Sequence, residues 1–207
     1  LGPESPELSK TLLELAAACY ELGDRREAER LFDQIEALLD RVELDTASLR
    51  ATLAVARSHA LIRAKKYAES EALVRPALAE LRRSYGNVHP GVESALNALA
   101  IAVKRQGRLD EAEPLYQELV ECSRSLYGET NDRYAISLAN RAALLESLGR
   151  RDEAENQYLA ALAIYEKVVD ADNVHRLSCE VNLAGLSLRD NRYVQAAQRY
   201  ETELPRL

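Results

Sequence analysis

Apolar side chains recur three and four residues apart along most of the chain, in pairs of stripes separated by a short break. Between residues 91 and 120, one stripe runs through Leu96, Leu99 and Val103, and a second stripe follows Gly107. Spacing of this kind places apolar side chains on one face of a helix. The segment is therefore predicted to form a helix, a turn and a second helix.

The same unit returns every 42 residues. Steps of 42 from Gly107 reach Gly23, Lys65, Gly149 and Asn191, and each lies between two apolar stripes. The residues seven before and five after each turn are all small: Ala16, Ser58, Ala100, Ala142 and Ala184, then Ala28, Ser70, Ala112, Ala154 and Ala196. Two antiparallel helices approach closely only where the residues at their crossing lack bulk. Larger side chains recur four residues after the second small position, at Phe32, Val74, Tyr116, Tyr158 and Tyr200. One such pair cannot bury its own apolar face, so neighbouring repeats are expected to stack.

The amino-acid sequence of the repeat resembles that of a known family. The segments LAAACYELGDRREAERLF, LAIAVKRQGRLDEAEPLY and RAALLESLGRRDEAENQY share a Gly turn followed by Glu-Ala, and Leu precedes the Gly in the first and third segments. Weaker copies are RSHALIRAKKYAESEALV and LAGLSLRDNRYVQAAQRY. This pattern resembles the tetratricopeptide repeat (TPR) family, whose usual unit is about 34 residues. HEAT and armadillo units run to about 40–47 residues, so the period alone would not separate them, whereas the turn pattern favours TPR.

The long unit, together with YGNVHPGVESALNALA, resembles the kinesin light chain type of TPR. There a Gly-x-x-His-Pro turn precedes an Ala-Leu-Asn-Asn-Leu-Ala helix. The resemblance implies an all-α fold, a right-handed α-solenoid of about five helix-turn-helix repeats. We predict a single TPR solenoid domain over residues 1–207, with repeats at about 5–43, 45–86, 88–128, 131–170 and 173–205. The absence of Met suggests a fragment of a longer protein.

Composition and charge exclude several classes of partner. Hydrophobic residues make up 47% of the chain, enough for a core, yet no apolar run approaches the 18 residues of a membrane span. A net charge of −7 argues against nucleic acid, because phosphates require a basic surface. Three cysteines, Cys19, Cys122 and Cys179, follow no metal-binding spacing and favour a reducing, cytoplasmic compartment.

The sequence offers little for catalysis. It contains no glycine-rich phosphate loop and no nucleophile elbow, and its carboxylates are spread over helix surfaces. His175 and Cys179 are four apart, but two ligands do not make a metal site. His89, before Pro90, is interpreted as a loop-packing or helix-capping residue. We therefore expect a protein that is not an enzyme and needs no cofactor or metal.

The resemblance implies a concave groove lined by the first helix of each pair. Carried over residue by residue, the predicted peptide-binding residues are Asn97, Asn140, Asn182, His59, Arg63, Ile101, Lys104, Arg105 and Arg189. Asn side chains can pair with both N–H and C=O of an extended peptide, and the cations would favour acidic groups in a partner. The alternative is that the Asn residues cap turns between helices and that the cations complement helix dipoles.

These residues predict a non-catalytic protein–protein interaction scaffold that binds a peptide segment or helix of a partner, acidic or with a bulky apolar anchor. Leu13, Ala17, Val55 and His59 replace the Lys and Asn of the carboxylate-clamp subclass, which disfavours a C-terminal carboxylate as the ligand. No polar capping helix follows the fifth repeat, so self-assembly into a homo-oligomer through the end repeats is one alternative. A peptide-sensing regulatory domain of a larger enzyme or transcription regulator is another.

Overall fold

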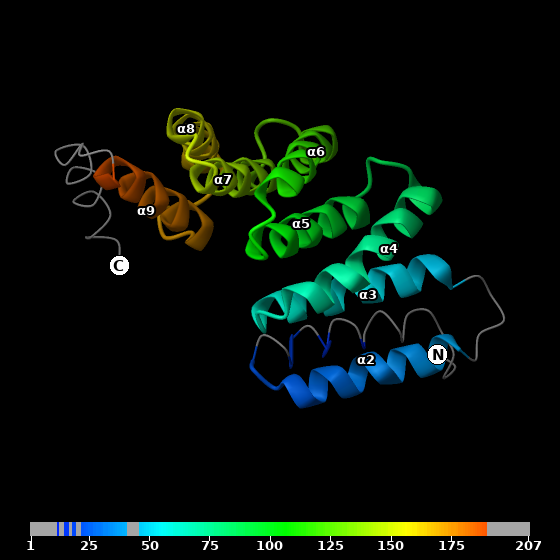
Figure 1. Ribbon diagram of the computed structural model, residues 1–207. Helices are drawn as coiled ribbons and strands as arrows, with labels where there is room; N and C mark the ends of the chain where they lie inside the picture. The colour runs from blue at the N-terminus through cyan, green and yellow to red at the C-terminus, as the bar shows by residue number, and fades with distance from the viewer. Residues whose placement is uncertain (1–11, 13–14, 17, 20–21, 41–45, 190–207) are drawn as a thin grey trace. The chain divides into compact units, whose positions relative to one another are not determined.

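A computed structural model describes residues 12, 15–16, 18–19, 22–40 and 46–189 (Figure 1). The described chain is helical, without strands, as predicted. Residues 12, 15–16 and 18–19 are also helical. The helices that follow them are α2 (Arg25–Leu39), α3 (Ala47–Arg63), α4 (Tyr67–Tyr85), α5 (Pro90–Arg105), α6 (Leu109–Tyr127), α7 (Asp132–Ser147), α8 (Arg151–Val168) and α9 (Val174–Arg189).

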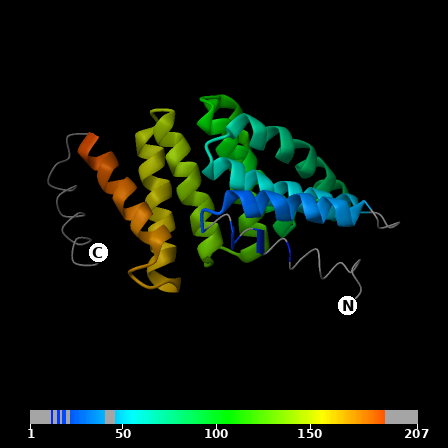
Figure 2. The ribbon, with the colours of Figure 1, turned by 90° about the horizontal axis from the view of Figure 1, so that it is seen from below.

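The helices belong to two compact units, residues 1–106 and residues 107–207. In the first unit, α3 packs against both α4 and α5. In the second unit, α7 packs against α6, α8 and α9. Figure 2 shows the close pairing of α3 with α4 and of α7 with α8. Within each unit, therefore, the first helices of two successive repeats are neighbours.

The turns inside the repeats share one backbone conformation. Gly23, Gly107 and Gly149 have φ of 85°, 81° and 77°, in the left-handed region that glycine tolerates best. Lys65 occupies the equivalent turn with φ of 61°. The predicted turns are confirmed at these four positions, and Asn191 lies outside the described residues.

The small positions predicted at the helix crossings are buried. Ala16, Ala28, Ser58, Ser70, Ala100, Ala112, Ala142, Ala154 and Ala184 are each at most 1% exposed. In the second repeat the Ser70 hydroxyl donates to the carbonyl of Ser58 across 3.1 Å, so the two positions are in contact. Phe32, Val74, Tyr116 and Tyr158 fill the core nearby. Ala196 and Tyr200 lie outside the described residues.

Side-chain caps fix where several helices begin. His89 is the N-cap of α5, and its Nδ1 accepts a hydrogen bond from the Gly91 N–H at 3.1 Å. Its ring stacks on Tyr85 at the end of α4, with 4.2 Å between centroids. Asn131 and Asn173 accept comparable bonds at the starts of α7 and α9. The predicted capping role of His89 is confirmed.

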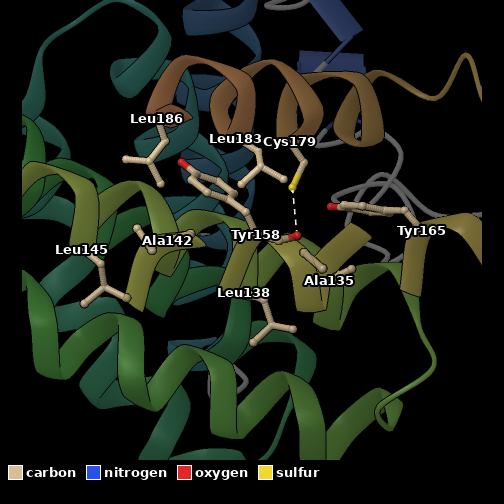
Figure 3. Packing of buried hydrophobic residues seen from close by; sticks show 11 residues of the cluster. Ala135, Leu138, Ala142, Leu145, Tyr158, Tyr165, Cys179, Leu183 and Leu186 are labelled. Carbon is tan, nitrogen blue, oxygen red and sulfur yellow. Dashed lines mark hydrogen bonds between the residues drawn. The ribbon is translucent and has the colours of Figure 1, made fainter. Parts of the chain in front are cut away.

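The core of the second unit holds α7, α8 and α9 together (Figure 3). Tyr158 and Tyr165 of α8 lie buried among Leu138 of α7 and Leu183 of α9. The Cys179 thiol lies 3.6 Å from the carbonyl oxygen of Tyr158, to which it donates. This cluster sets the spacing of α7 and α9, which carry the predicted groove residues Asn140 and Asn182.

Candidate peptide-binding pockets

The first unit contains a pocket of about 320 Å³ between the helices α3 and α5. Leu81 of α4, which is fully buried, also lines it. The lining residues are Thr52, Val55, Ala56, His59, Arg63, Leu81, Gly91 and Ser94. Most of this lining is apolar or uncharged, and the exposed Arg63 supplies the positive charge.

His59 joins the two walls of this pocket. Its Nε2 lies 3.1 Å from the Ser94 hydroxyl, within hydrogen-bonding distance. Burial lowers the pKa of the imidazole below its usual value of about 6.5, and the charge of Arg63 lowers it further. His59 is therefore neutral at pH 7, with one ring nitrogen as donor and the other as acceptor.

Gly91 keeps this pocket open at the start of α5. A Cβ atom at this position would lie 3.2 Å from Nδ1 of His89 and 3.5 Å from a methyl group of Leu81. The absence of a side chain therefore serves both the His89 cap and the pocket volume.

The second unit contains a smaller pocket, of about 90 Å³, between α7 and α9. Tyr165 of α8 lines it together with residues of both first helices. The full lining is Ile136, Ala139, Asn140, Ala143, Tyr165, His175, Ser178, Cys179 and Asn182. Two predicted groove residues, Asn140 and Asn182, thus share one pocket.

The two pockets occupy equivalent places in the repeat. Each residue of the first pocket corresponds to the residue 84 positions later, which is two repeats along the chain, and seven of its eight counterparts line the second pocket. These pairs are Thr52 and Ile136, Val55 and Ala139, Ala56 and Asn140, His59 and Ala143, Leu81 and Tyr165, Gly91 and His175, and Ser94 and Ser178. The same architecture therefore carries a larger, mostly apolar pocket in one unit and a smaller pocket with about equal polar and apolar lining in the other.

The remaining predicted groove residues lie elsewhere. Asn97, Ile101, Lys104 and Arg105 all belong to α5 and do not line the first pocket. Asn97 and Lys104 are half-buried, while Arg105 is exposed. Arg189 is the last residue of α9, and its side chain lies outside the described residues.

The alternative role of the asparagines as helix caps is wrong for these three residues. Asn97, Asn140 and Asn182 lie inside α5, α7 and α9, several residues from either end. The caps are formed by other residues, such as Asn131 and Asn173.

Sequence reasoning missed the contribution of the second helices. Leu81 and Tyr165 come from α4 and α8, whereas the predicted groove used first helices alone. The available signal is the repeat itself, since steps of 42 place Leu39, Leu81, Ser123 and Tyr165 at one position. All four are buried. Where the first pocket has Leu81, the second pocket has Tyr165, which adds a hydroxyl group to the lining.

Further chemistry in the described part of the chain is sparse. No group of three or more His, Cys, Asp and Glu residues is arranged there to hold a metal ion. Burial raises the pKa of the Cys179 thiol to about 12, which keeps it protonated and unreactive at pH 7. No described helix is long and apolar enough to cross a membrane.

Helix-turn-helix pairs with small residues at their crossings define an all-α repeat protein of the solenoid class. The tetratricopeptide repeat family model matches residues 49–125 and 92–167, which together make up more than half of the chain. The protein belongs to the tetratricopeptide repeat family. No curated protein sequence matches it.

Solved structures share the fold at low sequence identity. BtubC (BKLC) from P. vanneervenii is 20% identical, with a TM-score of 0.84 over 96% of this chain and 79% of that one. A Podosopora anserina protein described as a kinesin light chain with nearly identical TPR-like repeats is 19% identical, with a TM-score of 0.78 over 97% and 95%. A Rap protein complexed with Competence and Sporulation Factor is 16% identical, with a TM-score of 0.78 over 94% and 52%. These likenesses confirm the all-α repeat solenoid fold.

Proposed function

We propose that this TPR protein is a non-catalytic interaction scaffold that binds a peptide segment or helix of a partner protein across its first helices. The observation that carries the proposal is the equivalence of the two pockets. Each opens between successive first helices, and predicted groove residues line both of them: His59 and Arg63 in one, Asn140 and Asn182 in the other. The Rap structure, solved with Competence and Sporulation Factor, adds a TPR-like neighbour with a bound partner.

The first pocket suits an apolar anchor. Val55, Ala56 and Leu81 offer aliphatic surface, and about 320 Å³ accommodates a large side chain. Burying a side chain of that size contributes about 1.5–3 kcal/mol. The pocket therefore supplies affinity through apolar contact.

Positive charge near this anchor favours acidic neighbours in the partner. Arg63 borders the pocket, and Lys104 and Arg105 lie near the end of α5. On a chain of net charge −7, a local group of cations selects against basic partners and increases the rate of association with acidic ones. The preferred ligand is thus a segment with one bulky apolar residue beside acidic residues.

The proposal is tested by selecting a displayed library of random peptides on the full chain and on two variants, Asn140→Ala and Arg105→Glu. Each substitution removes a polar contact, so each should weaken the selected peptides about 5-fold or more, because one hydrogen bond contributes about 1 kcal/mol. Matched controls are Asn156→Ala on α8 and Arg26→Glu on α2, both exposed on second helices. These controls should change affinity less than 2-fold.

The outcomes separate the candidate functions. If the selected peptides bind all four variants equally, the binding site lies in the loops or on the opposite face, and the proposal is wrong. An absence of any selected peptide, with a mass that rises with protein concentration, would favour the self-assembly alternative.

A further inference from the structure

The Tyr165 hydroxyl is a buried polar group that makes no hydrogen bond with any described residue. The side chain is 1% exposed, yet it lines the pocket between α7 and α9. Figure 3 shows its ring extending from α8 toward Cys179, with the hydroxyl at the far end. Leaving such a group unpaired costs about 1–3 kcal/mol. A buried hydroxyl that lines a pocket and has no partner among the described residues indicates a group that arrives from outside.

The lining around Tyr165 is about half polar and carries no Arg, Lys, Asp or Glu. Asn140 of α7 and Asn182 of α9 carry amides, and Ser178 adds a hydroxyl that donates to the carbonyl of Val174. An ammonium group here would lose its hydration without gaining an ion pair, and a carboxylate could pair with His175 alone among the lining residues. A neutral group that both donates and accepts hydrogen bonds fits this lining, because Tyr and Asn side chains can do both as well.

Taking the proposed function as its basis, we propose that this pocket is a specificity subsite for a primary amide side chain, Gln or Asn, of the partner. Tyr165 donates to the amide oxygen, and the Asn side chains on the walls satisfy the amide hydrogens. The pocket of about 90 Å³ has room for a small planar group rather than a large apolar one. The equivalent pocket of the first unit, with Leu81 in place of Tyr165, contributes apolar contact instead.

Water is the competing occupant. At roughly 30 Å³ per molecule, the space would hold about three waters. Waters alone would satisfy the hydroxyl but would give Tyr165 no influence on which peptide binds.

The test is a selection of displayed random peptides on the full chain with Tyr165→Phe, and with Tyr158→Phe as a matched control. Tyr158 is equally buried in the same helix but does not line the pocket. We expect one library position enriched in Gln or Asn on the wild type and on Tyr158→Phe, and no such enrichment on Tyr165→Phe. Thermal unfolding of Tyr165→Phe should occur no lower than in the wild type, because the lost hydroxyl has no partner among the described residues.

A synthetic copy of a selected peptide makes the test quantitative. Changing its Gln or Asn to Leu should weaken binding about 5-fold on the wild type and less than 2-fold on Tyr165→Phe, and changing it to Lys, which finds no acidic partner in the lining, should weaken binding more than 10-fold on the wild type. The inference is overturned if the same amide position is selected on Tyr165→Phe, or if that position accepts charged or aliphatic residues equally. Peptides that depend on Asn140 but not on Tyr165 would overturn this inference alone. The failure to select any peptide would overturn the proposed function with it.

Discussion

Lys65 adopts a backbone conformation that its equivalents reach with glycine. Its φ is 61°, against 77° to 85° at Gly23, Gly107 and Gly149. In that region the Cβ of an L-residue crowds the following carbonyl, at about 1–2 kcal/mol. The second repeat nevertheless makes the same turn, because the buried Ser58 and Ser70 on either side require their helices to cross there.

Replacing Lys65 with Gly should therefore stabilise the protein. The strain relieved exceeds the extra entropy that Gly gives to the unfolded chain, so we expect about 0.5–1 kcal/mol of added stability. Urea unfolding followed by circular dichroism measures the change. Lys66→Gly is the matched control, since Lys66 has φ of −91° and should gain nothing. If the two substitutions change the free energy of unfolding equally, the backbone of Lys65 is not strained.

At the scale of helices, the crossing positions explain how each pair packs. Ala142 of α7 and Ala154 of α8 are both fully buried, seven residues before and five after Gly149. Neither has a side chain beyond Cβ, so the helices approach closely and Tyr158 packs beside the crossing. Packing of this density leaves no room for extra methylene groups.

Enlarging one crossing residue should separate the two helices. Ala154→Leu is expected to destabilise the protein by about 2–3 kcal/mol through overpacking. Ala160→Leu in the same helix is the control, because Ala160 is exposed and its change should stay within about 0.5 kcal/mol. Both values come from denaturant unfolding at one pH. A loss at Ala154 no larger than at Ala160 would be incompatible with a close crossing.

Ion pairs between helices contribute less to stability than the packing at the helix crossings. Arg57 of α3 pairs with Glu29 of α2 at 2.6 Å, and Arg150 before α8 pairs with Glu113 of α6. Their side chains are 28% to 38% exposed, so water and salt screen them. Apolar burial at the crossings, rather than these pairs, dominates helix association.

For the molecule as a whole, the buried Cys179 thiol makes the free energy of unfolding depend on pH in the alkaline range. Burial raises its pKa to about 12 in the folded state, whereas an exposed thiol ionises near pH 8.5. Between these values the unfolded chain releases a proton that the folded chain retains. Stability is therefore complete below about pH 8 and falls as the pH rises.

We expect this thiol to lower the free energy of unfolding by about 2 kcal/mol between pH 8 and pH 10. Cys179→Ser keeps a donor for the Tyr158 carbonyl and removes the ionisation, so its stability should decline less over the same range. Chemical unfolding of both proteins at a series of pH values measures the two slopes. Parallel slopes would show that folding does not raise the pKa of Cys179, against this prediction.

Much of the fold followed from local features of the chain. A period of 42, small residues at fixed offsets and a turn residue between apolar stripes predicted the helices, their pairing and the family. They could do so because close helix crossing demands small side chains wherever it occurs. His89 as a cap followed equally from its place before Pro90, since capping is a local interaction.

The candidate site depended on contacts between repeats. Asn140 and Asn182 were predicted as members of one groove, but their place in a single pocket follows from the packing of α7 against α9. Tyr165 was not predicted as a site residue, because a Tyr in the apolar stripe of a second helix is indistinguishable in sequence from any other core residue. Only the tertiary fold distinguishes it, because there the side chain lines a pocket between α7 and α9. Residues far apart in the chain form this pocket together.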